Sequence, residues 1–426
     1  MSNPTTKPYI LWAYQYVLEG RHYTGHINQD AVWPNQSCKE DDLELFYFEP
    51  RLIHYLDACK QQEPFIFPIS QRHFTGGQST QLANFRRQLA AFDWIPHEVL
   101  DACRRGQCTV YFEDRFEGYP EWRGIQVKYF VELANRLNIP TSAFIISTGN
   151  SKLEYVLEKY NTGLTFVHED WFRTEFWDRK LQSNPRLEHN CSDKDFVYLC
   201  YNRHWNENRQ YFVYELWRAG ILDCGLVSLP QADEQQRRDI NNPLYWSHWV
   251  ASMLDMNEAA GYAPDYLNRL PLVLDNPTFE NMAHVSNGGH FLQSYISVVT
   301  ETWGDNTSAF FTEKIYKSIT AEHPFMVLAG QHYLRHLRTQ GFKTYDGIID
   351  ESYDLEPHEG NRARMIVAEL RRISRMSKEQ LNEFWLATRE IAEYNRHQLS
   401  VDPEYGKNIY SVWANKYAGG SRWNVI

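Results

Sequence analysis

The sequence has no hydrophobic run of transmembrane length, and its short polar start, Met1 to Pro8, lacks the basic and apolar regions of a signal peptide. Its seven cysteines are an odd number, and no two of them have the C-x-x-C spacing. These absences argue against a disulfide framework and against a zinc site, and they are typical of a reducing compartment. We therefore expect a cytoplasmic protein without a membrane span.

Positive charge is also in short supply. The 43 Lys and Arg residues are outnumbered by 54 Asp and Glu residues, which gives a formal net charge of −11. This balance disfavours non-specific binding to nucleic acid, although a local basic patch would survive it. The sequence shows no cluster with metal-ligand spacing either, so we expect no metal and no permanently bound cofactor.

What the chain does have is length and a repeating pattern. Its 426 residues exceed one core of usual size and predict two domains. Short apolar runs alternate with helical patterns, which is typical of parallel sheets covered by helices. We expect an α/β fold of two Rossmann-like domains whose parallel sheets face a central cleft, with C-terminal helices. A polar stretch at 176–194 is the predicted linker, and the predicted domains are 1–190, 195–395 and a helical tail at 396–426.

The pattern also predicts individual elements. The expected strands are 9–16, 64–70, 108–112, 142–146, 164–167, 196–201, 224–229, 295–299, 325–328 and 342–345. The expected helices are 51–59, 81–92, 122–137, 151–160, 210–219, 312–323, 331–340, 359–397 and 402–414, with Ser377-Lys378-Glu379-Gln380 as a helix start.

Charged residues cluster in the stretch from Tyr295 to Gly330, between a predicted strand and the helix that follows it. Its first apolar run ends at Glu301, and Thr312-Glu313-Lys314 opens the helix after a polar loop. Ligands of open parallel sheets bind outside the carboxyl ends of the strands, and helix N-termini there favour phosphate. The pattern therefore indicates a nucleotide-diphosphate site. The alternative is an ordinary helix start, with Thr312 as N-cap, Glu313 favoured by the helix dipole and Lys314 solvated.

Two blocks of the second half, Asn202 to Arg209 and Val299 to Leu328, resemble the α1,3-fucosyltransferase family, which uses GDP-fucose. The block Phe310-Phe311-Thr312-Glu313-Lys314 is similar to the family's aromatic-V-T-E-K motif, and Pro324 to Leu328 is similar to the strand that follows it. Val299-Thr300-Glu301-Thr302 stands where the family has F-E-N, so Thr302 departs from the family's Asn. Upstream, Asn202 and Arg209 match the family's Asn and Arg with the same spacing.

The resemblance covers about 196–330 and implies a GT-B fold, with an acceptor domain at 1–190 and a nucleotide-sugar domain at 195–395. It implies that Arg209 and Lys314 neutralise the donor diphosphate, that Glu313 binds the ribose and that Glu301 lies near the transferred sugar. Thr312 and Asn202 belong to the same predicted donor site. Arg203 is a second phosphate candidate, and its alternative is an exposed turn residue.

An inverting transferase also needs a general base for the acceptor hydroxyl. The candidates are strand-end residues of the first domain: Glu113, Asp114, His168, Glu169 and Asp170. We favour Glu169 or Asp170, because two carboxylates and a His end one apolar strand. Ser147 to Asn150 ends another strand and is either part of an acceptor site or a helix-capping turn.

The sequence therefore predicts a metal-independent glycosyltransferase that moves a sugar from a nucleotide-diphosphate sugar, with a GDP-fucose-like donor favoured, to a glycan or another hydroxyl acceptor. Two alternatives stay open. One is a glycosyltransferase that modifies nucleic acid or protein. The other is a catalytically inactive glycan-binding or scaffold protein, whose 14 Trp and 27 Tyr would provide sugar-stacking surfaces.

Overall fold

The computed structural model divides the chain into two compact units. Unit 1 consists of residues 1–174 together with 402–426, and unit 2 consists of residues 175–401. The structure describes residues 8–14, 16–18, 21–23, 49–70, 95–114, 125–152, 162–181, 184, 186–191, 194–204, 206–230, 264–274, 288–302 and 304–418. The sequence pattern placed the division at 190–195 and a separate tail from 396, whereas the compact units divide after Thr174 and the last segment packs with unit 1.

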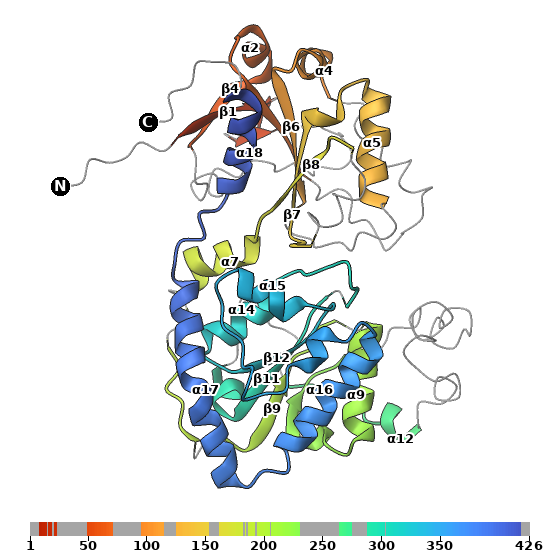
Figure 1. Cartoon of the computed structure of the whole chain (residues 1–426), viewed down its shortest axis with the longest axis vertical. Helices are drawn as coiled ribbons and strands as arrows, with labels where there is room; N and C mark the ends of the chain where they lie inside the picture. Colours follow the sequence, from red (N-terminus) through yellow and green to blue (C-terminus); the bar gives the residue numbers. More distant parts are fainter. Residues whose placement is uncertain are drawn as a thin grey trace, which may run out of the picture. The chain divides into compact units, whose positions relative to one another are not determined.

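Unit 1 is built on a six-stranded, fully parallel sheet in the order β4-β1-β5-β6-β7-β8 (Figure 1). Its strands are β1 (Tyr9–Tyr14), β4 (Glu49–His54), β5 (Phe65–Ser70), β6 (Cys108–Asp114), β7 (Phe144–Thr148) and β8 (Thr165–His168). Its helices include α2 (Tyr55–Lys60), α4 (His97–Arg104), α5 (Ile125–Leu137) and α18 (Lys407–Ala418), and two short strands, β2 (Tyr16–Leu18) and β3 (Arg21–Tyr23), pair separately.

Successive side chains of each strand fill two different cores. Phe65, Phe67 and Val110 belong to the core shared with α4 and α5, whereas Ile66 and Tyr111 belong to the core shared with α18. This alternation follows from the two-residue period of a strand. The sheet of unit 1 is therefore covered on both faces, as a doubly wound parallel sheet requires.

The helix predicted at 51–59 is wrong in its first half. Glu49–His54 forms strand β4, which pairs in parallel with β1 from Tyr9↔Glu49 to Tyr14↔His54. The helix α2 begins only at Tyr55, where the His54 side chain accepts from the Leu56 N–H. Pairing with β1 outweighs the helical pattern of these few residues, because short segments take their conformation from tertiary partners.

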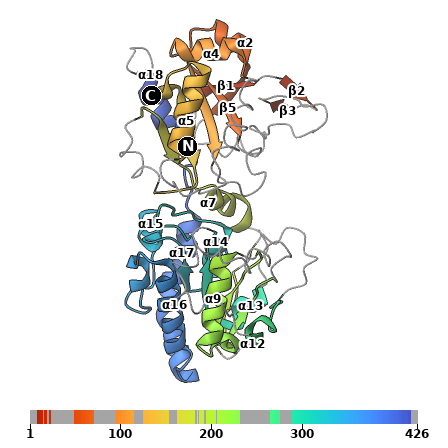
Figure 2. The same cartoon turned by 90° about the vertical axis from the view of Figure 1, so that its right-hand side faces the viewer.

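Unit 2 carries a four-stranded parallel sheet in the order β10-β9-β11-β12. Its strands are β9 (Phe196–Cys200), β10 (Gly225–Val227), β11 (Ser294–Thr300) and β12 (Phe325–Leu328). Its longer helices are α9 (Glu207–Arg218), α14 (Glu313–Thr320), α16 (Glu359–Ile373) and α17 (Lys378–Leu399). Figures 1 and 2 show α9 and α16 side by side on one face of this sheet and α14 and α17 on the other.

The predicted α/β class, with two Rossmann-like parallel sheets and C-terminal helices, is thus confirmed. The helix start at Ser377 is also confirmed, because Ser377 and Gln380 form a reciprocal capping box at the start of α17. The helices predicted at 81–92 and, for the most part, at 151–160 lie outside the described residues, as do the side chains of Glu113 and Asp114. Among the described helices, none combines the length and the apolar character that a membrane crossing needs.

The strand predicted at 342–345 is absent. Phe342 and Tyr345 are buried as the pattern indicated, but the Tyr345 N–H donates to the Glu351 carboxylate at 2.6 Å instead of to a neighbouring strand. The backbone N–H of Tyr345 therefore has a side-chain acceptor. Sequence periodicity does not indicate such a contact.

Candidate donor site at the carboxyl edge of the unit 2 sheet

Strands β9 and β11 are parallel neighbours, so their carboxyl ends lie at the same edge of the sheet. Asn202 follows β9 and is buried, and its side-chain oxygen accepts from the Thr300 hydroxyl at 2.6 Å. Its own N–H donates to Ser228 Oγ at 3.0 Å. Asn202 therefore ties the ends of β9 and β11 together and connects both to the segment after β10.

Arg209 enters the site from the first turn of α9. Asn206 caps this helix by accepting from the Arg209 N–H at 2.9 Å. The Arg209 guanidinium donates to the His204 carbonyl at 2.9 Å and to the Thr300 carbonyl at 3.2 Å, and its Nε is buried without a partner among the described residues. Burial lowers the pKa of Arg209, and the nearby carboxylates of Glu301 and Glu313 partly offset this effect. Arg209 is therefore a buried cation that adds positive charge at this edge of the sheet.

Helix α14 begins at the same edge with a side-chain cap. Thr312 is the N-cap residue, and its Oγ1 accepts from the Lys314 N–H at 3.3 Å. The same hydroxyl donates to Glu301 Oε2 at 2.6 Å. Part of the alternative reading of this motif is thereby confirmed, because Thr312 is a helix cap. The cap leaves the positive end of the helix dipole at the edge where Arg209 lies.

The Glu301 carboxylate is held by several donors. Its Oε1 accepts from the Tyr333 hydroxyl at 2.8 Å and from the Thr312 N–H at 3.3 Å, while Oε2 accepts from the Thr312 hydroxyl. The residue is only 3% exposed. Burial raises the pKa of Glu301, and Lys314 and these donors oppose the rise. In this arrangement Glu301 fixes the start of α14 to the end of β11.

The Lys314 ammonium sits within this cluster of oxygens. Its Nζ is 3.0 Å from Thr312 Oγ1, 3.4 Å from Thr302 Oγ1, 3.3 Å from Glu313 Oε1 and 3.7 Å from Glu301 Oε2. The side chains of Lys314 and Glu313 are 22% and 20% exposed. Burial opposes ionisation of Glu313, but Lys314 and Lys317 outweigh it and lower the pKa of this carboxyl. Lys314 is therefore neither buried nor simply solvated.

Arg203 is exposed, and it makes no hydrogen bond or ion pair that involves another described residue. It nevertheless lies near the cluster, because burial and then the charges of Arg203, Arg209 and Lys314 lower the pKa of His204. Its assignment to phosphate stays a prediction, since an exposed turn residue would look the same.

The candidate bases of unit 1 have local structural partners. Glu169 is buried, and its Oε2 accepts from the Gly406 N–H at 3.1 Å. Asp170 Oδ1 accepts from the Arg173 N–H at 3.0 Å and so caps α7 (Trp171–Glu175). The His168 carbonyl accepts from Asn408 Nδ2 at 3.4 Å. Their role as general base stays a prediction.

The segment from Ser147 to Asn150 forms a side-chain-bonded turn. Thr148 Oγ1 accepts from the Asn150 N–H, and Asn150 Oδ1 accepts from the Lys152 N–H. Ser147 Oγ accepts from the Tyr111 hydroxyl at 3.0 Å. These bonds agree with the capping alternative for this segment.

Sequence reasoning missed two residues that shape the site. Tyr333, the first residue of α15 (Tyr333–Thr339), is buried and donates to Glu301. Arg362 of α16 is 2% exposed and donates to the Gly304 carbonyl at 2.6 Å and to Asn306 Oδ1 at 2.9 Å. Both contacts cross long stretches of chain, and an Arg within an amphipathic helix gives no signal that it is buried.

No group of three or more His, Cys, Asp or Glu residues in the described part of the chain is placed to hold a metal ion. Cations and helix dipoles alone can stabilise a leaving diphosphate. Metal independence stays a prediction.

The chain is similar to known proteins only weakly, and only at the level of structure. No protein-family model and no curated protein matches the chain. Among solved structures, the chain is similar to a DNA-modifying β-glucosyltransferase studied with uridine diphosphoglucose, with 9% identity, a TM-score of 0.39, and coverage of 96% of this chain and 99% of that one. It is also similar to a UDP-forming α,α-trehalose-phosphate synthase from Burkholderia vietnamiensis, with 13% identity, a TM-score of 0.35, and coverage of 86% and 76%. Similarities this weak carry no argument about function.

Proposed function

We propose that this protein is a glycosyltransferase that moves a sugar from a nucleotide-diphosphate sugar to a hydroxyl acceptor. One observation carries the proposal. Arg209 and Lys314 lie in the first turns of the two helices that follow neighbouring parallel strands, so two cations and two helix N-termini gather at one sheet edge. That combination suits a diphosphate, which needs compensation for its charge as the sugar departs.

The surrounding groups give each part of the donor a partner. The partly exposed Lys314 ammonium would contact the diphosphate, and the buried Arg209 guanidinium would help to neutralise its charge. The Glu313 carboxylate, whose lowered pKa keeps it ionised, would accept hydrogen bonds from the ribose hydroxyls. Glu301 would act as a positioning residue, because its oxygens are already engaged by Thr312 and Tyr333.

The donor favoured by the sequence motifs is GDP-fucose or a related GDP-sugar, and the acceptor is a glycan or similar hydroxyl compound. Thr302 stands where the resembled family has Asn, and its hydroxyl faces the Lys314 ammonium at 3.4 Å. A general base in unit 1, Glu169 or Asp170, would take the acceptor proton as the anomeric carbon is attacked.

A nucleotide screen tests the proposal. Thermal-shift measurements with GDP, UDP, CDP and CMP should show stabilisation by at least one nucleoside diphosphate, because a ligand that binds only the folded state raises the melting temperature. Stabilisation by GDP would support the favoured donor class. The absence of any stabilisation would contradict the proposal and favour the inactive scaffold.

The substitution Lys314→Ala sharpens this test. It should weaken binding of the stabilising nucleotide at least tenfold in titration calorimetry, because it removes a charge partner of the diphosphate. Lys343→Ala is the matched control, since Lys343 is an exposed lysine of the same unit that lies over the Tyr394 ring. Equal affinities for the two variants would exclude Lys314 from the donor site.

A further inference from the structure

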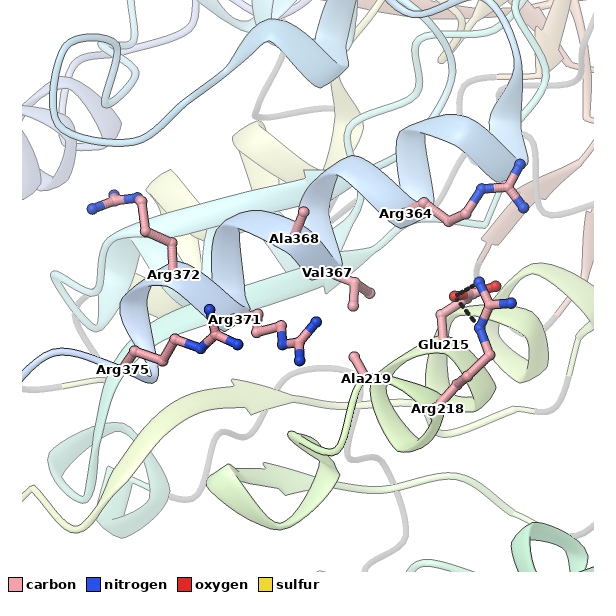
Figure 3. A pocket seen from close by; sticks show the side chains of 9 residues that line it. All are labelled: Glu215, Arg218, Ala219, Arg364, Val367, Ala368, Arg371, Arg372 and Arg375. Carbon is pink, nitrogen blue, oxygen red and sulfur yellow. Dashed lines mark hydrogen bonds and ion pairs between the residues drawn. The ribbon is translucent and has the colours of Figure 1, made fainter.

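A second basic feature lies away from the donor site, in a groove between α9 and α16 with a volume of about 460 Å³. Figure 3 shows the side chains that line it, with α16 on one side and the C-terminal half of α9 on the other. Arginines supply most of its polar groups: Arg218, Arg364, Arg371, Arg372 and Arg375. Glu215 is the single acidic residue among the nine that line the groove.

The five arginines differ in how far they are already engaged. Arg218 pairs with Glu215 at 2.8 Å, and Arg372 pairs with Glu369 at 2.6 Å. Arg364 donates to the Tyr211 hydroxyl and to Asn361 Oδ1, neither of which carries a charge. Arg371 and Arg375 are exposed, and their side chains have no hydrogen-bond or ion-pair partner among the described residues. The groove therefore presents positive charge that the protein itself does not neutralise, on a chain whose net charge is −11.

The helix dipole does not explain the whole arrangement. Arginines in the last turn of a helix are favoured by its negative end, which accounts for Arg218 on α9 and for Arg371 and Arg372 on α16. Arg364 lies in the first half of α16, where the dipole gives it no such advantage.

The arginines form a row and do not converge on one point. Arg364 and Arg371 are seven residues apart, a spacing that keeps them on one face of α16, and Arg375 lies in the turn just after this helix ends at Ile373. At 1.5 Å per residue, Arg364 and Arg371 are about 10 Å apart along the helix, and Arg375 extends the row beyond the helix end. Figure 3 shows Arg364 and Arg375 at opposite ends of the groove, with Arg371 between them. A single phosphate could not reach all three, whereas an extended polyanion could.

Nucleic acid is the polyanion that fits best. Guanidinium groups bind phosphates through paired N–H donors, and a strand of nucleic acid offers one phosphate per about 3.4 Å of helix axis. The residues lining the groove include no aromatic side chain that could stack on a base, which favours contact with the backbone irrespective of sequence. An anionic membrane fits less well, because interfacial binding needs apolar side chains to insert and none of the exposed large hydrophobic residues lines the groove.

We infer that the groove between α9 and α16 binds the phosphate backbone of nucleic acid through Arg364, Arg371 and Arg375. This inference does not depend on the donor site, although α9 contributes to both, with Arg209 in its first turn and Arg218 in its last. The two residues are nine positions apart, or about 13 Å along the helix.

The test measures binding of the full chain to a short fluorescent DNA duplex by anisotropy, at salt concentrations from about 50 to 200 mM. Wild-type protein should bind with an affinity that falls steeply with salt. Arg371→Glu and Arg375→Glu should each weaken binding at least tenfold at the lowest salt. Each should also reduce the slope of log affinity against log salt by about 1, the value for one lost phosphate contact.

Lys128→Glu is the matched control, because Lys128 is an exposed cation of α5 in unit 1 and the substitution changes the net charge equally. It should bind the duplex as the wild type does. The nucleotide-induced thermal shift of the groove variants, which should equal that of the wild type, shows that they are folded and separates this test from that of the donor site. Three results would overturn the inference: no binding by the wild type, equal losses for Lys128→Glu and Arg371→Glu, or binding to phosphatidylserine vesicles without binding to DNA.

Discussion

Glu301 shows how a residue can match a functional motif and still have structural work in the fold. The sequence placed this carboxylate at the end of a strand, next to a predicted donor, and the structure confirms that it follows β11 directly. The contacts of its carboxylate, however, indicate a structural role. Three donors from Thr312 and Tyr333 hold it, so its oxygens organise the helix start that a donor would approach.

The substitution Glu301→Gln should destabilise the protein by about 1–3 kcal/mol, because an amide nitrogen would replace one of two acceptors for buried donors. Its pH dependence has a definite sign. Since burial raises the pKa of Glu301, the folded state binds this proton more tightly than the unfolded state. The stability that Glu301 contributes is therefore complete below the usual Glu pKa of about 4.3 and falls as the pH rises through the raised value.

Urea unfolding of both proteins between about pH 4 and pH 7 checks this prediction. The advantage of the wild type over Glu301→Gln should shrink as the pH rises across that range, because Gln does not titrate. An advantage that grows with pH would mean that Lys314 and the hydroxyl donors outweigh burial, and that the folded carboxyl has a lowered pKa.

At the scale of the element, α14 depends on one hydroxyl group. The Thr312 side chain accepts from the Lys314 N–H and donates to Glu301, so it joins the helix cap to the strand end. Thr312→Val keeps the shape and removes both bonds. We expect it to lower the free energy of unfolding by about 1–2 kcal/mol, the usual cost of losing an N-cap, and to weaken nucleotide binding by loosening the first turn.

Thr312→Ser is the matched control, since serine keeps the hydroxyl and is itself a good N-cap. Chemical denaturation and calorimetry on the two variants separate the hydroxyl from the methyl group. If Ser loses as much stability as Val, the methyl packing rather than the cap holds α14, and the structural role given to Thr312 would be wrong.

Elements with a strong period could be predicted, and those set by a distant partner could not. The strand expected at 325–328 is β12 with the same bounds, and its four residues are all buried. By contrast, Arg51 to His54 form a strand only because β1 lies beside them, and Tyr345 finds its acceptor in Glu351. The site followed the same rule: Asn202, Arg209 and Lys314 lie within local motifs, whereas Tyr333 and Arg362 reach it from distant parts of the sequence.

At the scale of the whole molecule, the chain ends in the unit where it began. Residues from Asp402 on belong to unit 1, although the preceding helix α17 belongs to unit 2. Tyr405 and Ile409 pack with Ile10, Ile66 and Tyr111 on one face of the first sheet. Amphipathic periodicity predicted a helix here but contained no information about which sheet it would cover.

This arrangement predicts that unit 1 loses stability when α18 is weakened. Ile409 is fully buried, so Ile409→Ala should cost about 2–5 kcal/mol through lost burial and the cavity that remains. The loss should lower the melting transition of unit 1 by several degrees, at about 2–4 °C per kcal/mol for a domain of this size. Differential scanning calorimetry with and without the stabilising nucleotide can assign the transitions, because the nucleotide should raise only that of unit 2.

Ser411→Ala serves as the control, because Ser411 is an exposed residue of the same helix. It should leave both transitions within about 0.5 kcal/mol of the wild type, as most surface substitutions do. The contrast tests how stability is divided in this chain: Ile409→Ala acts on the first sheet from a residue near the far end of the sequence, while nucleotide acts on the second. If Ile409→Ala instead shifts the nucleotide-sensitive transition and leaves the other transition unchanged, α18 stabilises unit 2 and its assignment to unit 1 is wrong.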